Sequence, residues 1–412
     1  MAPERVLIIG AGMVGLSCAW SLQEHGVEVE VLDRQFVGGG ASWGNAGFVA
    51  PAFTVPLPEP SVLRDGARAV FDRASPVRLP KRPDAALARF LLRLVRHCTG
   101  AQWDRAMAGY RRMNAQVFDA FDAQGAGGVQ APVHDGAVLA AFENKQQAAH
   151  LMHGLEAVAA AGQPVDVQMF TGEQAREAEP HLSSRIGLAV RVGGQRYLDP
   201  AGYVSALGEQ VRIRGAKISE NVTATAVERV RGRSLVRCAD GTRREADAVV
   251  IANGAWMPGL AAAHGVRVPQ HPGRGYSFSV PLSEPLRGPL YFAAPRVAVA
   301  PRGDHAHVAG VMELRSPDHP LDRSRIDAIT RAIRPLINGA DWNGVSREWV
   351  GSRPLTGDGV PVVGPTRTEG VYVAGGHGMW GLTLGPLTGR LLADRLVTGS
   401  TPPELAWMNP VR

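Results

Sequence analysis

A glycine motif close to the start of the chain restricts its fold more than any other feature of the sequence. The motif has glycines at positions 10, 12 and 15, and it follows the short apolar run Val6–Ile9. After the motif, apolar residues keep a helical spacing as far as Leu22, and Gly26 is expected to end the helix. Valines then alternate along residues 27–31, and Asp33 follows, 18 residues after Gly15. This order of strand, glycine turn, helix, strand and acid is typical of a dinucleotide-binding βαβ unit.

Each of these residues has a definite place in such a unit. Gly10 permits the tight turn, Gly12 lets the backbone approach a pyrophosphate, and Gly15 lets the helix pack closely on the strand, while the free N–H groups of the helix face the anion. Asp33 can accept hydrogen bonds from ribose hydroxyls and disfavours a 2′-phosphate, although Arg34 beside it weakens the argument against NADP. The motif alone does not separate NAD from FAD.

Two further glycine-rich segments favour a flavin. The small-residue loop 38–48 follows the ribose acid, carries Ser42 and Asn45 as hydrogen-bonding groups, and leads into a proline-stiffened stretch. Near the other end, the apolar run Val371–Ala374 leads into glycines around His377 and a helix with a leucine face. The N-terminal end of that helix suits the flavin edge that becomes negative on reduction.

The composition excludes several classes of protein. The net charge is +6, but no run of like charges is present, so nucleic acid is not an expected partner. Three separated cysteines predict neither a disulfide framework nor a zinc site, and the 12 histidines show no metal-binding spacing. No apolar stretch approaches the length of a membrane span, and we expect a soluble, cytoplasmic protein.

The middle of the chain predicts helices and an antiparallel sheet. Helices are expected over 84–98, 103–121 and 144–161, and short alternating strands between 276 and 313. The helix over 84–98 combines arginines with leucines. An ordinary packed helix is the simpler interpretation, and contact with an anionic membrane, on the inner face, is the alternative.

Together with the motif at Gly10, five other stretches resemble the D-amino-acid oxidase superfamily. The resemblance is greatest to its D-amino-acid dehydrogenases and their D-hydroxyproline and glycine oxidase relatives. These stretches are GASWGNAGF at Gly40, RYLDP at Arg196, AVVIANGAW at Ala248, and the C-terminal pair GSRPLTGDGVPVVG and GGHGMWGLTLGPLTGR. The resemblance implies an α/β fold, with a Rossmann-like FAD-binding domain from residues 1–58, 197–261 and 348–412. It also implies an inserted, antiparallel-sheet substrate domain from residues 59–196 and 262–347.

The same resemblance implies non-covalent FAD and assigns residues to it. The ADP part is assigned to the first glycine motif, with Gly10, Gly12, Met13, Val14 and Gly15, to Asp33 and Arg34, to the backbone of Val222, and to Gly254 near the pyrophosphate. The ring is assigned to two further sets: Ser42, Asn45, Ala46, Gly47 and Phe48, and Gly376, His377, Gly378, Met379, Gly381, Leu382 and Thr383.

Candidate catalytic residues follow from the chemistry of oxidising an amino acid. A planar guanidinium grips both carboxylate oxygens, and the family places the arginine of its GxRP motif, here Arg353, at the pocket. Arg274 and Tyr276 form a second candidate pair, with a plain strand aromatic as the alternative for Tyr276. His377 either tunes the flavin or caps the following helix. No metal is expected, and no obligatory general base is needed.

The function expected from the resemblance is oxidative deamination of a small D-amino acid or D-proline-type imino acid. Glycine or secondary-amine oxidation, an NAD-linked dehydrogenase and an electron-relay subunit of a hetero-oligomer are the alternatives. The electron acceptor, oxygen or a quinone-type carrier, and the oligomeric state stay open.

Overall fold

The computed structural model describes residues 2–62, 77–80 and 84–412. Its first elements are strand β1 (Arg5–Ile9), helix α1 (Met13–Glu24) and strand β2 (Glu28–Leu32). The two strands are parallel, and Gly26 adopts a positive φ of 74° just after the helix ends. The predicted βαβ unit is therefore confirmed.

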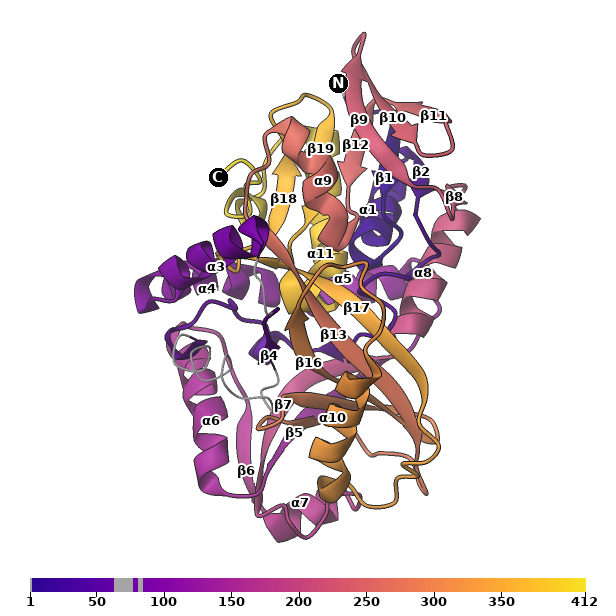
Figure 1. Ribbon diagram of the computed structural model, residues 1–412. Coiled ribbons are helices and arrows are strands. Elements are labelled where there is room, and N and C mark those ends of the chain that lie inside the picture. The colour runs from indigo at the N-terminus through magenta and orange to yellow at the C-terminus, as the bar shows by residue number, and fades with distance from the viewer. Residues whose placement is uncertain (1, 63–76, 81–83) are drawn as a thin grey trace.

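This unit belongs to a six-stranded sheet built from distant parts of the chain, in the order β18, β19, β12, β1, β2, β8 (Figure 1). The added strands are β8 (Lys217–Ser219), β12 (Ala248–Ile251), β18 (Val362–Pro365) and β19 (Val371–Gly375). All neighbouring pairs are parallel except β18 with β19 at one edge. Strand β1 therefore lies in the interior of the sheet beside a strand made about two hundred and forty residues later.

Alternate residues of β1 are buried on opposite faces of this sheet, as strand geometry requires. Val6 and Ile8 pack in one apolar cluster with α1 and the long helix α11 (Gly381–Thr398), beside α8 (Pro200–Ile213). Leu7 and Ile9 pack in a second cluster under α9 (Met257–Ala261) and a small three-stranded sheet. The strands of that sheet are β9 (Ala224–Val230), β10 (Arg233–Cys238) and β11 (Arg243–Ala246).

The second large layer is a ten-stranded sheet. Its path is β17 (Ser346–Thr356), β13 (Gln270–Pro281), β16 (His305–Leu314), β15 (Val297–Arg302), β14 (Leu290–Phe292), β5 (Val133–Phe142), β7 (Leu188–Leu198) and β3 (Phe48–Val49), with β4 (Val77–Arg78) beside β16 and β6 (Val167–Thr171) beside β7. Most pairs are antiparallel, but β14 with β5 and β16 with β4 are parallel. The predicted α/β class is confirmed, with a mixed second sheet.

Helices cover both ends of this layer. Helix α10 (Arg323–Ile333) packs Ile326, Ile329 and Ile333 against Tyr276 and Phe278 of β13. Helix α6 (Lys145–Ala160) packs against β5 and β7 at the other end, and the short α7 (Gly172–Ala178) connects β6 to β7. Helix α12 (Pro403–Ala406) lies against α11.

One stretch predicted to be helical is divided into two helices. The stretch 103–121 forms parts of two helices, α4 (Gly100–Asn114) and α5 (Val117–Ala126), that are separated at Ala115 and Gln116. The buried side chain of Asn114 ends the first helix, where its amide donates to the carbonyl of Thr54 at 2.9 Å. The helical spacing of apolar residues, on which the prediction rested, carries no information about this polar contact.

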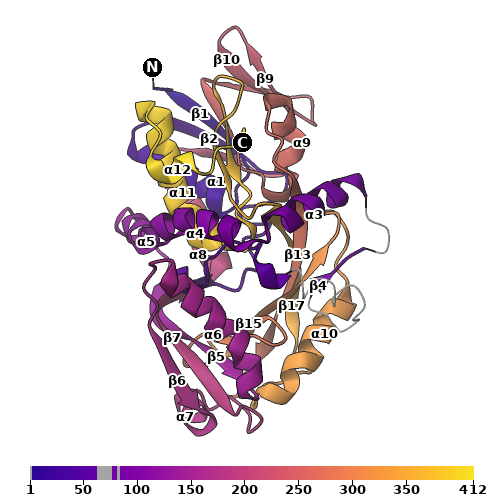
Figure 2. The same cartoon turned by 90° about the vertical axis from the view of Figure 1, so that its left-hand side faces the viewer.

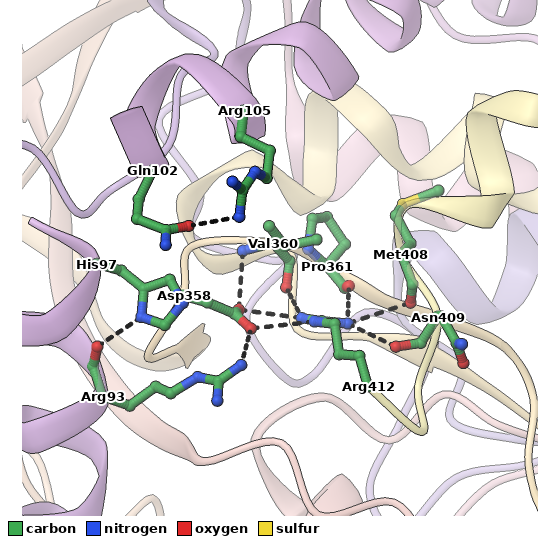
Figure 3. A network of polar contacts seen from close by, with 10 residues as sticks. All are labelled: Arg93, His97, Gln102, Arg105, Asp358, Val360, Pro361, Met408, Asn409 and Arg412. Carbon is green, nitrogen blue, oxygen red and sulfur yellow. Dashed lines mark hydrogen bonds and ion pairs between the residues drawn. The ribbon is translucent and has the colours of Figure 1, made fainter. Parts of the chain in front are cut away.

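Helix α3 (Ala85–His97) crosses the molecule with α4 between the two large sheets (Figure 2). It is anchored by buried Leu87 and Phe90, and by Arg93, which pairs with the buried carboxylate of Asp358 at 3.2 Å. Asp358 is also held by Arg412 through two contacts of 3.0 Å (Figure 3). Within residues 2–62, 77–80 and 84–412, no helix is both long and apolar enough to cross a membrane.

Candidate active site

A cavity of about 360 Å³ lies where the parallel strands of the six-stranded sheet end. It is lined by residues that directly follow three of them: Gly10 after β1, Asp33 after β2, and Ala252 after β12. The carboxyl ends of parallel strands are where open α/β sheets bind ligands. Strand β17 of the second sheet adds Arg353, so the cavity lies between the two layers.

Most of the predicted cofactor residues line this cavity. They are Gly10, Gly12, Met13, Val14, Asp33, Arg34, Ser42, Asn45, Val222, Gly254, His377, Gly378, Met379, Gly381 and Leu382. Gly15, Ala46, Gly47, Phe48, Gly376 and Thr383 are not among its lining residues. Lining residues that the sequence did not single out include Thr223–Thr225, Asn253, Trp256 and Ser352. Each of these lies within three residues of a predicted residue in the chain. The motifs therefore identified the segments that line the cavity, but not every residue that lines it.

The glycine motif has the geometry that a phosphate cradle needs. Gly10 has φ of +116°, and a Cβ there would lie 2.5 Å from the carbonyl oxygen of Ala252. A Cβ on Gly15 would overlap the carbonyl of Gly10. No side chain of the residue before α1 caps the helix, and the N–H groups of its first turn have no partners inside the helix. The positive end of α1 is thus presented at a bare glycine turn, which fits a pyrophosphate.

Asp33 follows β2, at the place where dinucleotide-binding βαβ units carry an acid that accepts ribose hydroxyls. Its carboxylate accepts the amide N–H groups of Ala11 at 2.7 Å and Gln35 at 2.8 Å. Burial raises the pKa of Asp33, and these two hydrogen bonds oppose that rise. A carboxylate has about four acceptor positions, so two remain for ribose hydroxyls. Nearby, the amide N–H of Val222, which also lines the cavity, donates to the carbonyl of Asp33 at 2.7 Å.

Arg34 is engaged in a clasp at the rim of the cavity, which we define as Arg34, Trp256 and Asp318. Arg34 stacks over the Trp256 ring at 4.5 Å and pairs with Asp318 at 3.0 Å, and the Trp256 indole donates to the same carboxylate at 3.1 Å. Asp318 belongs to the connection between β16 and α10, so the clasp joins the two layers. Two residues of the clasp, Arg34 and Trp256, line the cavity.

The loop 38–47 is fixed from several sides. Ser42 accepts the amide N–H of Met13 at 3.0 Å, and His307 of β16 donates from Nε2 to the carbonyl of Asn45 at 2.9 Å. Burial, with a smaller contribution from Arg302, lowers the pKa of His307 to about 3, so this imidazole is neutral. Phe48 then pairs with Tyr197, and its carbonyl accepts the Thr383 hydroxyl at 3.2 Å. Phe48 and Thr383 therefore join the end of the loop to α11.

His377 lies between β19 and α11 and is buried. Its Nε2 lies 3.0 Å from the hydroxyl of Thr388, which is also buried. Its Nδ1 has no hydrogen-bond partner among the described residues. Burial lowers the pKa of His377 to about 4. A neutral imidazole therefore lines the cavity, with one ring nitrogen still able to bind.

Arg353 is the cationic side chain of β17 that lines the cavity. Its Nη1 donates to the carbonyl of Val311 at 3.1 Å. Within the described part of the chain, no carboxylate forms an ion pair with it. Burial lowers the pKa of Arg353 to about 10, which still leaves the guanidinium charged at neutral pH. An unpaired charge of this kind favours an anionic ligand.

The structure brings neither Arg274 nor Tyr276 to the cavity. In the pairing of β13 with β17, Gly273 is opposite Arg353, so Arg274 projects from the other face of the sheet. There Glu313 accepts Tyr276 Oη at 2.8 Å and lies 3.4 Å from Arg274 Nη1. Arg274 Nη2 also donates to the carbonyls of His319, at 2.6 Å, and Pro320. Both side chains are fully buried, and this network joins β13 to the connection that carries Asp318.

Comparison with known proteins is decisive for the family. Residues 5–395 match the family described as FAD dependent oxidoreductase, DAO. The chain belongs to this family of FAD-dependent oxidoreductases. A D-amino acid dehydrogenase of Cereibacter sphaeroides is 30% identical over 97% of this chain and 92% of its own length. One from Methylobacterium radiotolerans is 30% identical over 97% and 96%.

Solved structures agree with the fold of this family. A glycine oxidase from Geobacillus kaustophilus superposes with a TM-score of 0.75 and 21% identity over 99% of both chains. An L-proline dehydrogenase from P. horikoshii superposes with a TM-score of 0.70 and 17% identity over 100% of this chain and 98% of its own. The glycine cradle, the helix N-terminus and the ribose acid of the DAO-family cavity fit FAD. No cysteine is among the described lining residues, and no cluster of three metal-binding side chains occurs in the described part of the chain.

Proposed function

We propose that this enzyme oxidises the α-amine of a small D-amino acid, or of a D-proline-type imino acid, to an imine that water hydrolyses to the 2-oxo acid. Bound FAD supplies the acceptor for the hydride that leaves the substrate Cα. The observation that carries the proposal is Arg353, a charged guanidinium without a carboxylate partner among the described residues, in the cavity whose glycine cradle fits FAD. The names of the similar dehydrogenases support the same substrate class.

In this proposal Arg353 binds the substrate carboxylate and thereby orients Cα. A planar guanidinium can contact both carboxylate oxygens at once, which fixes direction as well as distance. Asp33 is the one acidic residue among the described lining residues, and it belongs to the ribose end. No carboxylate therefore stabilises a substrate ammonium beside Arg353, and the amine reacts in its neutral form.

The roles of the other residues are part of the same proposal. The first glycine motif, Asp33, Arg34, Val222 and Gly254 hold the ADP part of FAD. Ser42 and Asn45 face the ring from one side, with Ala46, Gly47 and Phe48 supporting them, and the segment from Gly376 to Thr383 faces its pyrimidine edge. His377 acts there as a neutral group. The division into an FAD-binding domain (1–58, 197–261 and 348–412) and a substrate domain (59–196 and 262–347) belongs to the same proposal.

Glycine or a secondary amine is the second candidate substrate. It is favoured by the similarity of the fold to a glycine oxidase. The electron acceptor is either oxygen or a quinone-type carrier. Helix α3 bears on the second possibility, because Leu92 and Val95 are 53% and 51% exposed beside Arg89 and Arg96. Co-sedimentation with anionic vesicles tests whether α3 contacts a membrane, and light scattering tests for an oligomer.

Anaerobic flavin reduction tests the proposal. The purified holoenzyme is mixed with a panel of D-amino, L-amino and N-methyl amino acids, and loss of the oxidised flavin absorbance is followed. We expect D-amino acids to bleach the flavin, and Arg353→Ala to retain FAD but require far more substrate. Bleaching by glycine or sarcosine alone favours the second candidate. A protein that binds FAD but is bleached by no amine contradicts both.

A further inference from the structure

We propose that Gly275 and the backbone carbonyl of Val311 form a cradle that fixes the guanidinium of Arg353 for carboxylate binding before the substrate arrives. The inference rests on the proposed function and assigns positioning residues to that same site. Gly275 and Val311 lie on β13 and β16, so the cradle is supplied by two strands other than the one that carries Arg353.

Gly275 leaves the space that the guanidinium occupies. A Cβ at this position would lie 2.6 Å from Nη1 of Arg353 and closer still to Cζ and Nη2. These atoms form the planar end of a long side chain that can shift, so a methyl group at 275 would displace the guanidinium from this position. The φ of Gly275 is not positive, so its backbone conformation is open to any residue. The glycine is therefore explained by contact with Arg353 and not by a turn.

Val311 supplies the second part of the cradle through a β-bulge. Two steps along β13, from Arg274 to Tyr276, correspond to three along β16, from Glu313 to Gly310. Within this bulge Val311 has φ of +50°, a strained conformation that β-branched residues rarely adopt. The bulge directs the Val311 carbonyl to Nη1 of Arg353 at 3.1 Å. A strained residue whose carbonyl holds the candidate substrate-binding group is a feature expected of a functional site.

The cradle constrains the orientation of Arg353 without neutralising it. One of the five guanidinium N–H donors is used by a neutral carbonyl, and the charge remains available to a ligand. Ordering a long side chain costs free energy when a ligand binds, and a side chain that is already ordered avoids this cost. We therefore expect displacement of the guanidinium to weaken carboxylate binding more than it slows the later chemical step.

The test is Gly275→Ala in the FAD-loaded enzyme. Binding of acetate is followed by the change that it causes in the flavin absorption spectrum, and KM and kcat are measured with the best amino acid of the panel. We expect the acetate Kd and the KM to rise by about tenfold to a hundredfold, with a much smaller change in kcat and the flavin still bound. Gly154→Ala is the matched control, because a Cβ at that helical glycine meets nothing within 4 Å.

A double-variant cycle shows whether Gly275 acts through Arg353. In an Arg353→Ala background, we expect Gly275→Ala to add no further rise in the acetate Kd. Equal effects in the two backgrounds, or a wild-type Kd for Gly275→Ala alone, overturn the cradle. Acetate titration requires FAD but no turnover, so it separates the two inferences. If no amino acid reduces the flavin while Arg353-dependent acetate binding responds to Gly275→Ala, the proposed substrate fails and the cradle stands.

Discussion

Arg274 and Arg353 lie on neighbouring strands, yet the two faces of the sheet give them opposite environments. Arg274 lies under α10 with Glu313, Tyr276 and two backbone carbonyls as partners. Arg353 faces the cavity with one carbonyl. In β13 and β17 a displacement of one residue along the strand moves a side chain to the other face. The arginine on the face covered by α10 therefore belongs to a buried network, whereas the arginine on the cavity face has one backbone carbonyl as its partner and is the one we propose for ligand binding.

The largest effect is expected on the covered face. Arg274→Met leaves buried Glu313 with Arg315, 3.3 Å away, as its remaining cation, so the cost is expected at the lower end of the about 3–5 kcal/mol for breaking a buried ion pair. We expect a clearly lower midpoint of urea unfolding, with the KM of the folded enzyme unchanged. Arg331→Met, at an exposed arginine of α10, is the control. A rise in KM without loss of stability contradicts the assignment of Arg274 to a structural network.

The cavity face is expected to show the reverse pattern. Arg353→Ala removes a charged partner of the substrate, which costs about 2–5 kcal/mol in binding and raises KM by about thirtyfold or more. Stability changes little, because no ion pair within the described part of the chain is broken. Arg353→Lys retains the charge but not the planar fork, so its KM is expected to lie between that of the wild-type enzyme and that of Arg353→Ala. Steady-state kinetics on enzyme with a full complement of FAD measures this, and an unchanged KM for Arg353→Ala removes Arg353 from the site.

A smaller effect is expected from two neutral histidines on the cavity side, His307 and His377. Burial holds their pKa values at about 3 and about 4, below the ordinary value near 6.5 that applies after unfolding. Between pH 6.5 and 4 the unfolded chain therefore binds more protons, and the free energy of unfolding falls as the pH falls. His377→Gln and His307→Gln should each flatten this dependence. An unchanged slope in both variants contradicts the buried neutral state.

The smallest effect is expected at the clasp. Asp318→Ala removes an exposed ion pair with Arg34, worth about 1 kcal/mol or less, and one hydrogen bond from Trp256. We expect FAD to dissociate up to about fivefold faster, measured by the recovery of flavin fluorescence on dilution. Asp327→Ala, at another exposed acid in the same part of the chain, is the control. Equal dissociation rates for both variants indicate that the clasp does not retain the nucleotide.

The nucleotide end of the molecule could be predicted from the sequence because its chemistry depends on the backbone. Gly10, Gly12 and Gly15 are needed for φ and for close approach, and such needs leave a fixed pattern in the sequence. The strands and the first helix followed from this pattern, and the resemblance to the family followed from its occurrence together with the later motifs. The roles of the individual residues in binding FAD stay predictions.

The other end depends on contacts between strands that are distant in the chain. Whether Arg274 or Arg353 reaches the cavity is decided by the register of β13 and β17 and by the bulge at Val311. No local pattern encodes either. One local signal was present: Gly273 and Gly275 lie on either side of Arg274, and two glycines on the same face of a strand leave space there for a side chain of the neighbouring strand. The break between α4 and α5 has the same origin, because Asn114 bonds to Thr54, sixty residues earlier.

The position of β1 in the middle of the six-stranded sheet also affects how this protein can be made. Glu4, beside β1, bonds to Asp247, beside β12, across 243 residues, and β19 follows only at Val371. A ribosome must therefore release most of the polypeptide before the first strand gains its second neighbour. Because such long loops close slowly, the nascent βαβ unit stays exposed during synthesis, and we expect the production of intact enzyme to depend on chaperones and on the supply of flavin nucleotide.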